Sequence, residues 1–124
     1  MKTISIQRPW PEAILRGEKT IECRDWQTKY RGILAIHVSL KPWATNFFDE
    51  SYYKIKGVII GTVDLIRIKE YYGENDFFND NAKHLVPMGN WTRYGWILEN
   101  PVRFKTPIPY KGKLGLYNVN VEAI

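Results

Sequence analysis

The stretch at 58–69, VIIGTVDLIRIK, constrains the fold more than any other part of this 124-residue chain. Its run of β-branched and other apolar residues predicts a long strand, and Gly61 within the run indicates a bulge or bend. Asp64 lies in the same apolar run. Because a buried carboxylate must be paired or protonated, we expect Asp64 either to pair with an arginine or to act as a catalytic acid or base.

Shorter apolar or alternating segments occur at several other places in the sequence. Apolar or alternating runs predict further strands over 2–7, 19–24, 33–40, 94–100 and 114–121, of which the strand at 94–100 stops at Pro101. Two helices are expected, one over 10–17, with Pro11 in its first turn and Gly17 at its C-terminal cap, and one over 46–56, where aromatic residues have helical spacing. Residues 72–90 are predicted to form a long loop that contains His84. Five to six strands and two or three short helices in one domain, residues 1–124, indicate an α+β fold in which helices cover the openings of a small β-barrel.

The segment from Gly17 to Arg24, GEKTIECR, places a base, an acid and a guanidinium directly after the glycine that ends the first helix. Glu22 and Arg24 would share one face of a strand, and Lys19 can join Glu22 because it follows the glycine turn. In a cleft with little solvent, Lys19 would serve as an anion clamp, or as a base or nucleophile of lowered pKa, with Glu22 relaying protons. On an open surface the same residues would form ion pairs that contribute little.

The strand at 33–40 supplies further polar side chains. It is apolar on both faces, as expected of a central strand. Alternation places Ala35, His37 and Ser39 on one side of it. These three residues are predicted to form the floor of a small polar cavity.

The charge distribution favours an anionic partner. The net charge is +5, and basic residues outnumber acidic ones both in residues 1–45 and in residues 91–124, so the two ends would form one basic face if they meet. Basic residues alternate with aromatic ones after the GEKTIECR segment, a pattern that offers phosphate contacts and stacking surfaces to a nucleic acid. A core rich in tryptophan would also account for the aromatic residues. The residues of the basic and aromatic loop and of a later basic turn are Trp26, Lys29, Tyr30, Arg31, Lys111 and Lys113.

Several other chemistries lose support. The chain has no GxGxxG, Walker A, HExxH or CxxC signature, and one cysteine with two histidines does not make a zinc site, so we expect no cofactor and no metal. The cysteine, Cys23, is expected to be a buried inert thiol rather than a nucleophile. No apolar run is long enough to cross a bilayer, and the first residues lack the apolar stretch of a secretory signal, so a cytoplasmic protein is expected.

Five segments in a fixed order resemble the activating signal cointegrator homology (ASCH) family. The resemblance covers nearly the whole chain apart from residues 72–90, and the order of the segments makes it specific. The segments are QRPW at 7–10, GEKTIECR at 17–24, YRG at 30–32 with the following strand, GVIIGTVDL at 57–65, and WILENP at 96–101 with KGKLGL at 111–116.

The resemblance implies a fold similar to the PUA domain of RNA-modifying enzymes, a cleft lined by the GxKxxExR motif, and association with RNA or other nucleic acid. One branch of the family hydrolyses the amide of N4-acetylcytidine with a lysine and a threonine of this motif and a glutamate from a later strand, and another member has been described as a ribonuclease. By position, Lys19 and Arg24 match the family's lysine and arginine. Glu22 stands where the amidohydrolase branch has threonine, and Asp64, the candidate for the later acid, is one methylene shorter than glutamate.

Three functions therefore stay open. The first is binding of RNA, a nucleotide or a modified base, in which Lys19 and Arg24 contact phosphate, Glu22 accepts hydrogen bonds and aromatic residues stack on bases. The second is a metal-independent hydrolase, a ribonuclease or an amidohydrolase, and the third is an adaptor for a protein partner. The predicted binding residues are Lys19, Glu22, Arg24, Trp26, Tyr30, Arg31, His37, Ser39, Lys111 and Lys113. The predicted catalytic residues are Lys19, Glu22 and Asp64.

Overall fold

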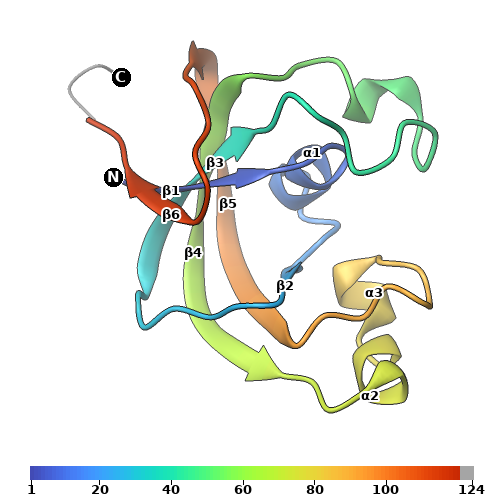
Figure 1. Ribbon diagram of the computed structural model, residues 1–124. Coiled ribbons are helices and arrows are strands. Elements are labelled where there is room, and N and C mark those ends of the chain that lie inside the picture. The colour runs from blue at the N-terminus through green and yellow to red at the C-terminus, as the bar shows by residue number, and fades with distance from the viewer. Residues whose placement is uncertain (121–124) are drawn as a thin grey trace.

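The computed structural model describes residues 1–120, in which six strands form one curled sheet and three short α-helices gather on one side of it (Figure 1). The predicted α+β fold class of five to six strands with two or three short helices is confirmed. The strands are β1 (Lys2–Ile6), β2 (Ile21–Arg24), β3 (Gly32–Val38), β4 (Val58–Glu70), β5 (Tyr94–Pro109) and β6 (Leu116–Asn118). The helices are α1 (Trp10–Leu15), α2 (Glu74–Phe78), α3 (Asn81–His84) and the 3-10 helix η1 (Glu50–Tyr52).

The strand order β2-β5-β4-β3-β1-β6 makes the sheet an open half-barrel with β2 and β6 at its two edges. Only β1 and β3 pair in parallel among the described strands, and β4 and β5 are long enough to curve through the height of the molecule (Figure 1). The predicted bend at Gly61 is present, because the register of β4 against β5 shifts between Ile59 and Gly61. A Cβ atom at Gly61 would lie 2.2 Å from the carbonyl oxygen of Val102, so only glycine fits this crossing.

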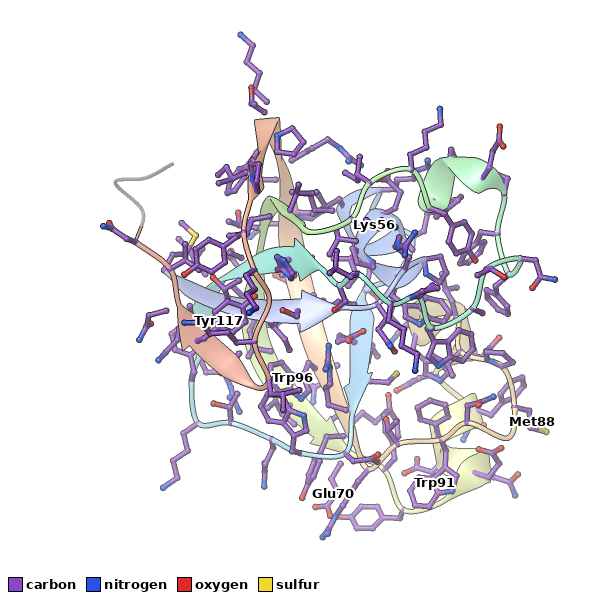
Figure 2. All side chains as sticks on the ribbon, turned by 45° about the horizontal axis from the view of Figure 1, so that its top comes forward. Lys56, Glu70, Met88, Trp91, Trp96 and Tyr117 are labelled. Atoms are coloured by element: carbon purple, nitrogen blue, oxygen red, sulfur yellow. The ribbon has the colours of Figure 1, made fainter. Side chains whose placement is uncertain are left out.

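The main core fills the inside of this curl. It joins apolar side chains of α1 to those of β1, β3, β4 and β5, and Trp96, labelled in Figure 2, is fully buried there. The expected start and end of the first helix are confirmed, since Pro11 lies in its first turn and Gly17 follows its end with a φ of +78°. That turn carries the chain from α1 into β2.

The helix predicted over 46–56 is wrong, because only the 3-10 helix η1 forms there. The side chain of Asp49 accepts a hydrogen bond from the backbone N–H of Ser51, and such local bonds compete with a continuous helix. The aromatic residues with helical spacing instead pack on α1, where Phe47 and Phe48 each meet the ring of Trp10 edge-on. Their spacing reflects this cluster and not a helical face.

The loop predicted over 72–90 is also wrong in part, because it contains α2 and α3. Phe77 is fully buried, and its ring stacks on that of His84 with the ring centroids 4.0 Å apart. His84 is therefore a core histidine and not a loop residue: its Nε2–H donates to the carbonyl of Phe77, and its Nδ1 accepts from the N–H of Val86. The stacked pair of Phe77 and His84 holds both helices. Because each helix buries one residue of this pair and no apolar face, the sequence shows no helical periodicity there.

The strand expected to stop at Pro101 continues through it, and β5 runs to Pro109. Asn100, just before the proline, adopts a φ of +54°, and such a local kink lets the strand pass a residue that has no N–H to donate. The last predicted strand, over 114–121, is shorter as β6, and its final residue lies outside the described residues. Within residues 1–120, no helix has the length and apolar character needed to span a membrane.

Candidate functional site

A cleft of about 620 Å³ opens between the two edges of the half-barrel. Its walls come from β1, β2, the end of β3, the loop before β6 and the segment that follows α3. The polar and aromatic side chains that line it are Ser5, Gln7, Trp10, Lys19, Glu22, Cys23, Arg24, His37, Ser39, Trp43, Asn90, Thr92, Lys111 and Lys113.

Lys19 lies at the bottom of the cleft and is 1% exposed. The turn after α1 holds it, because its backbone N–H donates to the carbonyl of Ala13. Its Nζ donates to the carbonyl oxygen of His84 at 2.5 Å, lies 4.5 Å from the ring centre of Trp10, and lies 3.9 Å from Oε1 of Glu22. Burial lowers the pKa of Lys19, although the nearby Glu22 carboxylate opposes this shift.

Glu22 joins Lys19 to Arg24. Its Oε2 accepts from Nε of Arg24 at 3.0 Å and lies 2.9 Å from Nη2, so the carboxylate stands between two cations. The Nη2 group of Arg24 also donates to the carbonyl oxygen of Ser5 at 2.9 Å and thereby links β2 to β1 across the gap in the sheet. The three charged residues of the motif therefore form one row along the cleft floor.

The predicted polar face of β3 also reaches the cleft. His37 and Ser39 line its wall, whereas Ala35 packs in a second small core cluster with Ile59 and Tyr117. Burial lowers the pKa of His37, partly offset by a hydrogen bond to the carbonyl of Tyr110. Hence a neutral imidazole faces the cleft at pH 7.

Aromatic side chains line one end of the cleft, and basic side chains lie at its rim. The ring centroids of Trp10 and Trp43 lie 5.1 Å apart, and Trp43 is 37% exposed. On the loop before β6, Lys111 and Lys113 are both exposed at the rim. The two ends of the chain thus do meet, and part of the basic charge predicted from them surrounds this opening.

Four of the predicted site residues do not line the cleft. Trp26 packs edge-on against Trp96, and Tyr30 donates its hydroxyl proton to the carbonyl of Ile33, so both have structural contacts. Arg31 donates to the backbone carbonyls of Thr28 and Tyr30. Asp64 was expected to be buried, but it is only half-buried and accepts from Nδ2 of Asn100, away from Lys19.

Sequence reasoning missed Ser5, Trp10 and Trp43 as cleft residues. The alternation in KTISIQ carried a signal for Ser5, since it opposes Ile4 and Ile6, but its pairing with His37 depends on the parallel contact of β1 with β3. Trp43 lies in an irregular loop with no period. Its place is set by a long-range bond from its N–H to the carbonyl of Arg8.

Cys23 lines the cleft but is a poor nucleophile, because burial raises the pKa of its thiol to about 11. The sequence predicts a buried inert thiol; Cys23 is only half-buried, and its lack of reactivity stays a prediction. Among residues 1–120, no three His, Cys, Asp or Glu side chains are grouped so that they could hold a metal ion.

Comparison with known proteins places the chain in a family. The model of the ASCH domain matches residues 4–108. Activating signal cointegrator 1 from Homo sapiens and from Mus musculus are each 24% identical over 132 residues, which cover 94% of this chain and 22% of theirs, so the chain spans about a fifth of the length of these relatives.

Solved structures agree on the fold. The crystal structure of ASCH from Zymomonas mobilis superposes with a TM-score of 0.71 at 15% identity, covering 98% of this chain and 89% of that one. A point mutant of the same protein gives a TM-score of 0.70 at 15% identity, with 98% and 91% of the two chains covered. From its sequence match and its half-barrel, this chain belongs to the ASCH domain family.

Proposed function

We propose that this protein binds RNA and takes one unpaired nucleotide into the cleft. The observation that carries the proposal is the composition of the cleft: a space of about 620 Å³ brings exposed aromatic surface, a buried row of charged groups and a basic rim together. Single-stranded RNA is recognised in this way, by stacking on aromatic rings, hydrogen bonds to base edges and cations for phosphate. Membership of the ASCH family, which has nucleic-acid-binding members, supports the same choice.

The proposal gives some residues other roles than those expected from the sequence. Trp43, and not Trp26 or Tyr30, is the aromatic residue that can stack on a base, because it is both exposed and in the cleft lining. Lys19 is too deeply buried to reach a phosphate in solvent, so it would donate to a base carbonyl while Glu22 accepts from an exocyclic amine. Contacts to phosphate then fall to Lys111 and Lys113 at the rim.

Fluorescence anisotropy of a labelled unstructured oligoribonucleotide tests the proposal. Removal of one stacking ring by Trp43→Ala should weaken binding by about 1–3 kcal/mol, roughly 5- to 150-fold in Kd. Trp91 is an exposed tryptophan on the loop after α3 and does not line the cleft, so Trp91→Ala is the matched control (Figure 2). Equal Kd values for the two variants would refute the stacking role.

Salt dependence tests the basic rim. For single strands, each phosphate contact adds about 0.7 to the slope of log K against log salt. Lys111→Ala and Lys113→Ala should each lower this slope and weaken binding to all sequences alike. RNA binding that is absent at low salt, or that ignores salt, would reject the proposal and favour a protein partner.

A hydrolase is the second candidate, and the lowered pKa of Lys19 is the observation that favours it. Burial favours the neutral form of the amine, which is the form that can act as a base or nucleophile, with Glu22 as the proton relay and Arg24 as the stabiliser of negative charge. Asp64 lies outside the cleft and is not needed in this scheme. Incubation with N4-acetylcytidine and with oligoribonucleotides, beside Lys19→Ala, tests it; turnover that survives the substitution would exclude Lys19.

A further inference from the structure

A second group of polar side chains lies along the wall of the cleft, separate from the Lys19 row. Ser5 on β1 and His37 on β3 line the cleft, and Tyr117 on β6, labelled in Figure 2, joins them from outside the cleft lining. Ser5 Oγ lies 2.9 Å from Nδ1 of His37 and 2.7 Å from the hydroxyl of Tyr117. On the other side of the ring, Nε2 of His37 lies 2.7 Å from the carbonyl oxygen of Tyr110.

One acceptor, the carbonyl of Tyr110, fixes the direction of the hydrogen bonds that link His37, Ser5 and Tyr117. The carbonyl of Tyr110 only accepts, so Nε2 of His37 carries the proton and Nδ1 of the neutral ring accepts. The hydroxyl of Ser5 therefore donates to His37, and that of Tyr117 donates to Ser5. The backbone of Lys113 hydrogen-bonds the Tyr117 hydroxyl and holds that end of the hydrogen-bonded series in place.

This arrangement is that of a nucleophile with its base, the base being oriented by a third group. Burial favours the neutral imidazole, which is the form that can accept the serine proton. Ser5 and His37 both line the cleft, so a ligand held there can approach them. The backbone of Gly112 packs directly against the pair, since a Cβ atom there would lie 2.8 Å from Ser5 Oγ and 2.7 Å from Cε1 of His37, and any larger residue at this position would press on both side chains.

A positive group stands beside the same serine. Nη2 of Arg24 donates to the backbone carbonyl of Ser5 at 2.9 Å, which places the guanidinium next to the residue that would carry the reacting oxygen. Negative charge that develops on a substrate at Ser5 would therefore form beside a cation.

We propose that Ser5 and His37 form a nucleophile and base pair that hydrolyses an ester-linked acyl group on a ligand held in the cleft. Only the nature of the ligand, a nucleotide or RNA end, rests on the proposed function; the pair itself does not. The oxygen behind His37 is a neutral carbonyl and not a carboxylate, so it orients the ring but gives less support to an imidazolium. An ester, whose leaving oxygen departs more readily than an amide nitrogen, fits this weaker base.

The reaction proceeds through an acyl enzyme. Ser5 Oγ bonds to the acyl carbon while its proton passes to Nδ1 of His37. The bond from that carbon to the leaving oxygen breaks, and the leaving oxygen takes the proton from Nδ1, so the ligand leaves as an alcohol. Water then attacks the acyl carbon and gives a proton to Nδ1, and the proton returns to Ser5 Oγ as the carboxylic acid departs.

A fluorophosphonate probe tests the pair without knowledge of the ligand. Ser5 Oγ would form a bond to phosphorus, fluoride would leave, and His37 would take the serine proton. Mass spectrometry of the digested wild-type protein should place the adduct on Ser5, which requires no variant to fold. The proposal would be overturned by an adduct on another residue, or by labelling of Ser5 that is no faster than the labelling of free serine.

Matched variants and an ester substrate complete the test. Ser5→Ala should abolish labelling and p-nitrophenyl acetate hydrolysis, and His37→Gln, which keeps polar atoms at the site, should slow both by at least about 100-fold. Ser51→Ala, on η1 and outside the cleft lining, should label normally. RNA binding on the same preparations separates the two proposals: no Ser5 adduct with intact RNA binding rejects the pair alone, and an adduct without RNA binding rejects the proposed function alone.

Discussion

The buried ammonium group of Lys19 should make the stability of the fold depend on pH. Burial lowers its pKa below the ordinary 10.5, so the folded chain holds this proton less tightly than the unfolded chain does. Between the lowered pKa and 10.5 the unfolded state binds more protons, and the free energy of unfolding therefore rises with pH by up to about 1.4 kcal/mol per unit. This contribution is complete above 10.5 and is lost as the pH falls through the lowered pKa.

Lys19→Met removes the titrating group while it keeps a long flexible side chain. The variant loses the hydrogen bond to the carbonyl of His84, which costs about 1–3 kcal/mol at every pH, and it also loses the desolvation penalty of the charge. Relative to this variant, the wild type should gain stability with rising pH between the lowered pKa of Lys19 and 10.5, by up to about 1.4 kcal/mol per unit. The pKa of Cys23, raised to about 11, keeps its thiol protonated in the folded state over this range.

Urea unfolding followed by far-ultraviolet circular dichroism at several pH values provides the measurement. Lys56 is an exposed lysine, labelled in Figure 2, and Lys56→Met is the control that should follow the wild-type dependence. Equal pH dependence in the wild type and in Lys19→Met would refute the assignment of Lys19 as a buried, desolvated ammonium group.

Three further changes test other parts of the fold. Gly61→Ala should lower the free energy of unfolding by about 1–3 kcal/mol or more, because its Cβ would press on the backbone of Val102; a neutral result in urea unfolding would contradict the close crossing. Tyr71→Phe should cost about 1.5–3 kcal/mol in the same assay, since the buried hydroxyl donates to the carboxylate of Asp80 at 2.6 Å, and an unchanged unfolding midpoint would argue against this bond. Burial lowers the pKa of His84 below the ordinary 6.5, so the folded state loses stability as the pH falls through the lowered value. The free energy of unfolding of His84→Gln should therefore decrease less with falling pH than that of the wild type, and equal decreases would contradict the assignment of a buried neutral His84.

The parts of this fold that local patterns dictate were predictable. The strand β4 follows from a long run rich in β-branched and apolar residues, and the end of α1 follows from Gly17, which alone among common residues adopts its φ of +78° at little cost. The GxKxxExR motif was correctly expected to gather Lys19, Glu22 and Arg24, since residues two or three apart after a turn are held together by the local chain. These features need no knowledge of distant contacts.

Features that depend on distant contacts were not predictable from the pattern. Phe77 and His84 stabilise two short helices through a stacked pair, and neither residue belongs to a periodic run. Trp26 and Trp43 both lie in polar segments without a periodic pattern, yet Trp26 is half-buried against Trp96 of the core and Trp43 lines the cleft. Only the curl of the sheet, which a single sequence does not encode locally, distinguishes them.

The contact between β1 and β6 has a consequence for how the protein acquires its cleft. Ser5 and Tyr117, whose hydroxyls bond to each other, are 112 residues apart, and the ammonium group of Met1 donates to the carbonyl of Val119 next to the same pair of strands. Closing so long a loop costs entropy before it is repaid by contacts, and such topologies fold slowly. We therefore expect the cleft wall to assemble late in folding, so that a ligand that needs both strands would recognise only chains that have completed folding.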